Sequence, residues 1–140
     1  MQNEINKVAL AYILDLRGDL LIAKRDQSKH TVGFWQFPGG KLKGGGARVQ
    51  AIQREFLEEL AIEVAATTLL VSFILPKDSD LEFFPVICQR LGGDIVLFGY
   101  DEYSFVTLEI FDQFSLAPAD VTAAQMSVNY SRTNPENWIR

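Results

Sequence analysis

The chain has few of the residues that would place it in a membrane, in an oxidising compartment or on a nucleic-acid polymer. Its one cysteine, Cys88, cannot form an internal disulfide, so we expect a buried thiol and a reducing, cytoplasmic location. No apolar run approaches the roughly 18 residues of a membrane-spanning helix, and residues 1–4 do not resemble a secretory leader. The 18 acidic residues outnumber the 13 basic ones, which argues against a nucleic-acid polymer as partner.

The remaining composition is that of a globular domain. Hydrophobic residues make up 48% of the 140 residues and charged residues 22%, enough apolar mass for one sizeable core. No linker, repeat or low-complexity tract interrupts the chain, so we predict a single domain over residues 1–140. A small phosphorylated ligand is compatible with the net charge of −5, because a bound metal reverses the local sign.

Apolar patterning predicts several strands around one strong helix. The expected helices cover residues 47–60 and 118–126, and residues 127–140 show no clear pattern. Pro85 predicts that its strand is an edge strand or carries a bulge. The turn Arg17-Gly18-Asp19 predicts a hairpin, and the expected strands cover residues 8–16, 20–23, 34–37, 66–75, 81–91, 95–98 and 105–110. Such an arrangement is typical of an α+β or α/β sandwich.

Three glutamates of the longer predicted helix form an acidic stripe. Glu55, Glu58 and Glu59 are spaced i, i+3 and i+4, so they share one side of the helix, beside its apolar face. Like charges at this spacing repel by a few tenths of a kcal/mol per pair. Three converging carboxylates suit Mg²⁺ or Mn²⁺, although such a stripe taken alone is usually just a solvated face.

A glycine-rich segment precedes this helix. Gly39 and Gly40 allow the backbone to approach a ligand closely. The loop over residues 41–46 leads into the helix N-terminus, whose free N–H groups and partial positive charge suit a phosphate. A metal-binding stripe next to an anion-binding loop predicts a metal–phosphate substrate.

The segment between residues 40 and 62 resembles the Nudix box, G-x5-E-x7-R-E-U-x-E-E-x-G-U, where U is a bulky aliphatic or similar residue. Residues 35–40 (WQFPGG) are similar to the lead-in of MutT-type members. Gly46 stands where the pattern has Glu, and Ala61 where it has Gly. The matching positions are Gly40, Arg54, Glu55, Phe56, Glu58, Glu59 and Ile62. The resemblance implies the α/β Nudix fold, an α/β/α sandwich with a mixed sheet and one box helix.

The resemblance also implies a metal site, with Mg²⁺ expected and Mn²⁺ possible. Its ligands are the Gly40 carbonyl, Glu55, Glu58 and Glu59, with a further carboxylate from a later loop, for which Glu102 is the candidate. Glu58 is expected to orient or deprotonate the attacking water. Arg54 completes the catalytic pair, although without a glutamate at position 46 we expect it to be short of a partner.

Five other residues are candidates for contact with the substrate. Arg25 and Lys41 are expected to neutralise developing phosphate charge, unless Arg25 is simply an exposed strand end. Phe37 and Asp120 fall where MutT-like proteins contact the base, although Asp120 fits a helix N-terminal charge equally well. Gly39 completes this set.

The reaction implied by the resemblance is metal-assisted hydrolysis of a nucleoside di- or triphosphate, typically to a monophosphate and pyrophosphate, as in nucleotide-pool cleaning. One alternative is a Nudix enzyme acting on dinucleoside polyphosphates or nucleotide sugars, because the box is common to all of these. The other is a non-catalytic nucleotide-binding module, which Gly46 favours. The sequence indicates neither the base nor the oligomeric state.

Overall fold

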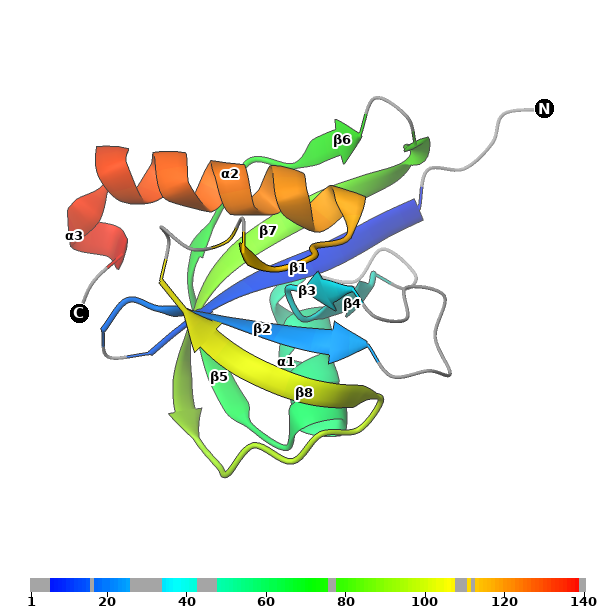
Figure 1. Cartoon of the computed structure of the whole chain (residues 1–140), viewed down its shortest axis with the longest axis vertical. Coiled ribbons are helices and arrows are strands. Elements are labelled where there is room, and N and C mark those ends of the chain that lie inside the picture. The colour runs from blue at the N-terminus through cyan, green and yellow to red at the C-terminus, as the bar shows by residue number, and fades with distance from the viewer. Residues whose placement is uncertain are drawn as a thin grey trace.

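The fold is seen in a computed structural model of the whole chain, which describes residues 6–15, 17–25, 34–42, 48–75, 78–107, 111 and 113–138. Figure 1 shows a twisted sheet with a long helix across one face. In chain order the elements are β1 (Asn6–Leu14), β2 (Leu20–Arg25), β3 (Trp35–Gln36), β4 (Gly39–Lys41), α1 (Arg48–Leu60), β5 (Glu63–Leu69), β6 (Phe73–Leu75), β7 (Asp78–Gly92), β8 (Tyr100–Val106), α2 (Pro118–Thr133) and α3 (Pro135–Trp138).

The sheet formed by the described residues is mixed, as predicted. Its main strand order is β3-β2-β1-β7-β5, with β4 also paired to β1, β6 to β7 and β8 to β2. The parallel pair is β1 and β7, in register from Asn6 opposite Leu81 to Leu14 opposite Gln89. The other strand pairs are antiparallel.

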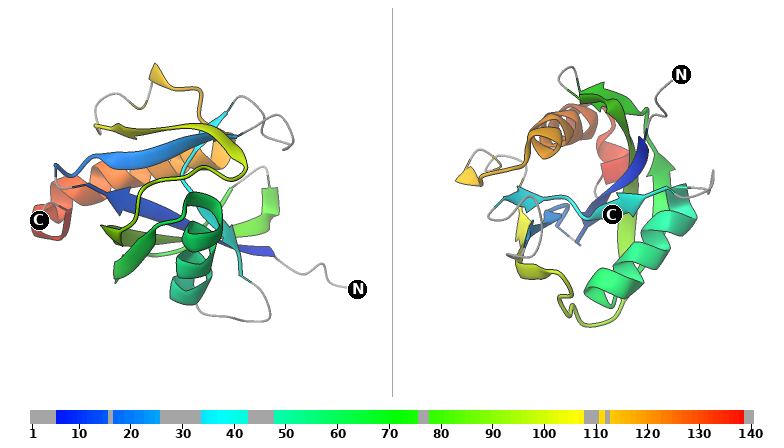
Figure 2. Two further views of the ribbon diagram at one scale, coloured as in Figure 1. Left: turned by 90° about the horizontal axis from the view of Figure 1, so that it is seen from below. Right: turned by 90° about the vertical axis from the view of Figure 1, so that its right-hand side faces the viewer.

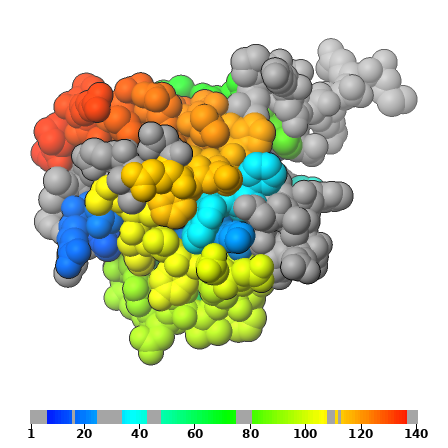
Figure 3. Space-filling view, in the orientation of Figure 1, coloured from blue at the N-terminus to red at the C-terminus, as the bar shows by residue number. Residues whose placement is uncertain are grey.

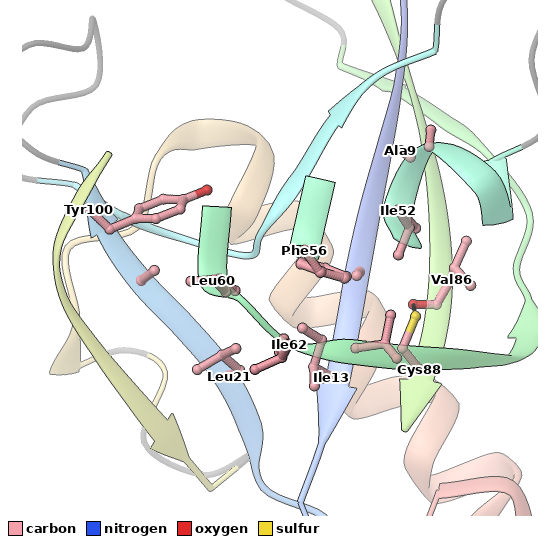
Figure 4. Packing of buried hydrophobic residues seen from close by; sticks show 14 residues of the cluster. Ala9, Ile13, Leu21, Ile52, Phe56, Leu60, Ile62, Val86, Cys88 and Tyr100 are labelled. Carbon is pink, nitrogen blue, oxygen red and sulfur yellow. Dashed lines mark hydrogen bonds between the residues drawn. The ribbon is translucent and has the colours of Figure 1, made fainter. Parts of the chain in front are cut away.

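Apolar side chains cover both faces of the central strands because a helix packs on each face. On β1, alternate residues point to opposite sides: Ala11 and Ile13 join the cluster with α1, whereas Tyr12 and Leu14 join the cluster with α2. Figure 2 shows α1 and α2 on opposite sides of the sheet, and Figure 4 shows the α1 cluster. This arrangement confirms the predicted α/β/α sandwich.

The predicted strand over residues 66–75 is two strands, and the strand that contains Pro85 is an interior strand with register shifts, not an edge strand. β5 ends at Leu69 and β6 begins at Phe73, and both pair with β7. Pro85 lies inside β7, between β1 on one side and the gap from β5 to β6 on the other, where its carbonyl accepts the Leu70 N–H at 3.0 Å. Of the two alternatives predicted for this strand, the structure supports the bulge: the register of β7 shifts against β5 between Arg90 and Gly92 and against β6 between Asp78 and Glu82, away from Pro85 itself.

Residues 95–98 are not the predicted strand. The N–H groups of Val96 and Phe98 donate to the Leu60 and Glu59 carbonyls, at 3.1 and 2.8 Å, so the end of α1 takes the place of a neighbouring strand. β8 follows at Tyr100 and includes the first two residues of the predicted strand 105–110, of which residues 108–110 lie outside the described part.

The second predicted helix continues beyond residue 126. α2 ends at Thr133, seven residues later, and Ser127 on the added turns is fully buried. Its hydroxyl donates to the Ala124 carbonyl at 2.7 Å, which satisfies a polar group inside the helix. None of the helices in the described residues is both long and apolar enough to cross a bilayer.

Candidate active site

The glycine pair before the box helix lies in β4, where the sequence predicted a loop. Gly39 and Gly40 pair with Leu10 and Ala9 of β1. A Cβ at Gly39 would lie 2.0 Å from the Ala9 carbonyl oxygen, so no larger residue fits between the two backbones. The close backbone approach predicted for Gly39 is therefore made to the neighbouring strand β1.

Gly40 places the backbone directly against a carboxylate of the box helix. A Cβ there would lie 2.4 Å from Glu55 Cγ and 2.8 Å from Glu55 Oε1. The Glu55 side chain is 17% exposed, and Arg54 Nη2 lies 3.6 Å from its Oε1. The fold thus brings together three of the residues singled out by the box: Gly40, Arg54 and Glu55.

Arg54 has a carboxylate partner in this structure. The expectation that it would lack one rested on Gly46, which lies outside the described residues. The ion pair with Glu55 on the same helix supplies the negative charge instead. That expectation for Arg54 is therefore wrong.

The other two glutamates of the stripe differ in their surroundings. Glu58 is exposed to solvent. Glu59 is half-buried, and its Oε2 accepts a hydrogen bond from the Tyr100 hydroxyl at 2.9 Å. Tyr100 is 5% exposed and packs in the same core cluster as Phe56 and Leu60, as Figure 4 shows. Tyr100 was missed in the sequence because no motif marks it.

The carboxylates of the stripe engage separate partners. Among the residues that the structure describes, no three side chains of His, Cys, Asp or Glu lie close enough together to hold a metal. Glu55 turns towards Gly40 and Arg54, and Glu59 towards Tyr100. The three glutamates, Arg54 and Gly40 nevertheless belong to α1 and β4, two elements that lie in direct contact.

Glu102 is not brought to this group. It lies in β8 opposite Lys24 of β2, with Lys24 Nζ 3.9 Å from Glu102 Oε2. Lys24 alternates in phase with Leu20 and Ile22, which pack on the α2 side of the sheet, whereas the stripe lies on α1. The register therefore directs Glu102 away from the box helix, and we leave it out of the ligand set.

Asp120 and Phe37 lie together at the N-terminus of α2. Asp120 is 6% exposed, and its Oδ1 accepts the Phe37 N–H at 2.7 Å. The Phe37 ring is 3% exposed and meets Tyr12 and Phe111 edge-to-face, at centroid distances of 5.2 and 5.6 Å. This ring is a core residue and offers no open face for stacking. Asp120 anchors the chain between β3 and β4 to the first turn of α2. This contact supports the alternative in which Asp120 has a structural role at the helix N-terminus.

The negative charge of Asp120 also acts on a buried phenol. Tyr12 donates its hydroxyl hydrogen to the Ala123 carbonyl at 2.7 Å. Burial raises the pKa of Tyr12 above its ordinary range, and Asp120 raises it further. On the α2 side of the sheet, a neutral phenol therefore lies beside a carboxylate, and apolar residues enclose both.

The two basic residues predicted to contact phosphate, Arg25 and Lys41, lie at the ends of strands. Arg25 is the last residue of β2, where its backbone lies opposite Tyr100 beside a register shift. Lys41 is exposed at the end of β4, opposite Val8. Lys41 therefore follows Gly40 in the same strand, and Arg25 lies in the strand next to that of Tyr100.

A comparison with protein families matches the NUDIX domain model to residues 5–128. This range includes all the strands and most of α2. It also includes the whole box segment and both of its departures, at positions 46 and 61.

Two curated proteins are similar to parts of the chain. It is 43% identical over 63 residues to an 8-oxo-dGTP diphosphatase of Proteus vulgaris, covering 45% of this chain and 56% of that protein. It is 39% identical over 54 residues to a CTP pyrophosphohydrolase of Escherichia coli, covering 39% and 40%. The matched segments thus span about half of these relatives' length.

Solved structures match over almost the whole chain. The solution structure of the E. coli ORF135 protein has a TM-score of 0.77 at 25% identity, covering 94% of both chains. The crystal structure of a MutT protein of Methanosarcina mazei has a TM-score of 0.74 at 23% identity, covering 96% of this chain and 98% of that one. The latter likeness shows the shared fold alone.

Proposed function

Because this chain belongs to the Nudix family, we propose that it is a divalent-metal-dependent hydrolase that splits a nucleoside triphosphate into a monophosphate and pyrophosphate. The observation that carries the proposal is the contact between Gly40 and Glu55, beside the Arg54 ion pair. It places the first and the central parts of the box against each other, although fourteen residues lie between Gly40 and Glu55 in the sequence. The names of the two curated relatives favour a nucleoside triphosphate as substrate.

The residues at the box helix fit a hard cation. Carboxylate and carbonyl oxygens are the donors that Mg²⁺ and Mn²⁺ prefer. A glycine at position 40 leaves room for the Glu55 carboxylate beside the backbone, room that any Cβ would fill. We propose the Gly40 carbonyl, Glu55, Glu58 and Glu59 as ligands. A cation bound there would supply Lewis-acid polarisation of the phosphate oxygens and a bound water of lowered pKa.

The chain's own groups would then divide the remaining work. Glu58, the exposed member of the stripe, is proposed to orient the attacking water and to accept its proton. Arg54 holds Glu55 in place through their ion pair. Arg25 and Lys41, at the ends of β2 and β4, are proposed to balance charge on the phosphates, together with the N–H groups that begin α1.

The choice of base is a separate part of the proposal. The curated relatives carry the names of an 8-oxo-dGTP diphosphatase and a CTP pyrophosphohydrolase, so the purine and the pyrimidine remain alternatives. Asp120 is proposed to contact the base in addition to its bond with Phe37, because a carboxylate accepts several hydrogen bonds. Sanitation of damaged nucleotides is the role that the first of these substrates would imply.

A panel of substrates tests the proposal. The chain is incubated with Mg²⁺ and, separately, 8-oxo-dGTP, dGTP, CTP, ADP-ribose, a dinucleoside polyphosphate and a nucleotide sugar, and released pyrophosphate and phosphate are measured. We expect pyrophosphate from a triphosphate. Preference for ADP-ribose, a dinucleoside polyphosphate or a nucleotide sugar would favour the other Nudix classes. Nucleotide binding without any hydrolysis would replace the enzyme by a binding module.

The proposed role of Glu58 has its own test. We expect Glu58→Gln to lose most of the hydrolysis at saturating Mg²⁺, because the amide cannot take a proton from water. Its metal-free melting temperature should hold or rise, because one like-charge repulsion is removed. Glu63→Gln, an exposed residue of β5 away from the stripe, is the control and should keep the wild-type rate. Near-normal turnover of Glu58→Gln would remove this residue from the catalytic group.

A further inference from the structure

Glu59 is held at both its main chain and its side chain by the segment that leads into β8. The Glu59 carbonyl accepts the Phe98 N–H at 2.8 Å, and its Oε2 accepts the Tyr100 hydroxyl at 2.9 Å. The neighbouring Leu60 carbonyl accepts the Val96 N–H at 3.1 Å. One short stretch of chain thus fixes the last turn of α1 and the carboxylate that projects from it.

The same segment is itself fixed on the helix end. Ile95 and Leu97 pack against the core cluster of α1. Gly93 has φ +95°, and a Cβ there would lie 2.7 Å from the Ala61 carbonyl oxygen, so the segment begins in close contact with the residue that follows the helix. In Figure 3 the yellow-green residues before β8 form the lower end of the surface. The hydroxyl of Tyr100 is therefore presented from a packed support.

We infer that Tyr100 is a positioning residue for the proposed metal ligand Glu59. This inference rests on the proposed function, because it assumes a cation at the box helix. Tyr100 is 5% exposed and comes from β8, so its ring cannot follow a swinging glutamate into solvent. The hydrogen bond therefore selects one carboxylate orientation before a cation arrives.

The chemistry of the two groups allows both roles at once. An ionised carboxylate has two oxygens and about four lone pairs, so accepting one hydrogen bond leaves capacity for a cation. Groups that hold a metal ligand from outside the coordination sphere commonly change metal affinity by about ten- to a hundredfold when they are removed. Loss of the Tyr100 hydroxyl is thus expected to weaken binding of the metal alone.

The experiment measures Mn²⁺ binding to the nucleotide-free protein. Tyr100→Phe removes only the hydroxyl, and we expect its dissociation constant for Mn²⁺ to rise about tenfold. Tyr103→Phe is the matched control: the same change on the same strand, at a residue that is 44% exposed, should leave Mn²⁺ affinity unchanged. Unchanged affinity in Tyr100→Phe, with or without a lower metal-free melting temperature, would overturn the inference.

A double-mutant cycle tests whether Tyr100 acts through Glu59. In the background of Glu59→Gln, which removes the charge of the ligand, Tyr100→Phe should have little further effect on Mn²⁺ affinity. Equal effects in both backgrounds would show that the hydroxyl acts by another route. Glu55→Gln separates the two proposals: if it leaves Mn²⁺ binding intact, the metal site itself fails. If it weakens binding while Tyr100→Phe does not, only the role of Tyr100 fails.

Discussion

Replacement of Ala61 by glycine tests how the box helix ends. In the described residues, Ala61 is the non-glycine residue with a positive φ, +58°, and the Nudix pattern has glycine at this position. An L-residue in the left-handed region costs about 1–2 kcal/mol, a strain that glycine does not feel. Against this gain, glycine adds about 0.4–1 kcal/mol of chain entropy to the unfolded state and removes a half-buried methyl. The net expectation is a stabilisation of about 0.5 kcal/mol.

A matched substitution makes this small effect measurable. Ala65 is also half-buried, but it lies in β5, opposite Gln89, with an ordinary strand backbone. Ala65→Gly should destabilise the chain by about 0.5–1 kcal/mol. Because both changes remove a methyl and loosen the unfolded chain alike, the difference between them isolates the left-handed strain of about 1–2 kcal/mol.

Urea unfolding of both variants and of the wild type is the assay. We expect Ala61→Gly to raise the free energy of unfolding and, for a chain of 140 residues, to raise the melting temperature by about 2 °C. Ala65→Gly should lower both. If the two variants lose the same stability, the left-handed end of α1 is refuted, and with it the view that Ala61 is a strained substitution in the box.

Four further outcomes follow from the site and the core. Gly40→Ala should lower Mn²⁺ affinity because its Cβ displaces Glu55, whereas Gly92→Ala, with nothing within 4 Å of the added atom, should not. Equal affinities would separate Gly40 from the site. Millimolar Mg²⁺ should raise the wild-type melting temperature, by the equivalent of about 2.7 kcal/mol at a hundredfold excess over its dissociation constant, and no shift would count against the metal site. Burial raises the pKa of Cys88 from 9.0 to about 12, so stability should fall by about 1.4 kcal/mol per pH unit as pH rises between these values, and Cys88→Ala should show a shallower slope in urea unfolding. Gly46→Glu should raise activity or metal affinity by adding negative charge at the start of the box helix, and a lower rate would contradict this.

Patterns within a short stretch of sequence predicted the helices and strands whose formation depends mainly on the residues of that stretch. The hairpin around Gly18 and the helix that bears the glutamate stripe form where the periodicity placed them. The element pattern predicted an α+β or α/β sandwich, the resemblance implied its α/β/α form, and the apolar residues of β1 do pack against a helix on each face. Residues 95–98 look like a strand for the same reason, yet they pack against the end of a helix. Apolar composition predicts that a segment is buried, but it does not indicate which element the segment packs against.

Contacts between distant parts of the chain could be predicted only where the box links the residues. The box predicted that Gly40 and Glu55 act together, and the structure places them in contact. Nothing in the sequence links Tyr100 to Glu59, because their pairing depends on how residues 93–99 cross the end of α1. Glu102 shows the reverse error: it is an acidic residue at a plausible distance along the chain, but the pairing with Lys24 turns it to the other face.

The two departures from the box have different physical consequences. Ala61 keeps the backbone conformation that the pattern requires, so its cost is local strain, and the geometry of the helix end is retained. At position 46 the negative charge of the box glutamate is missing instead, and a neighbouring carboxylate can supply such a charge. The ion pair of Arg54 with Glu55 is such a replacement, at the price of engaging a proposed metal ligand with an arginine. Glu55 thus serves both the ion pair with Arg54 and the proposed cation, and a carboxylate at position 46 would give Arg54 a second partner, which is why Gly46→Glu is expected to raise metal affinity.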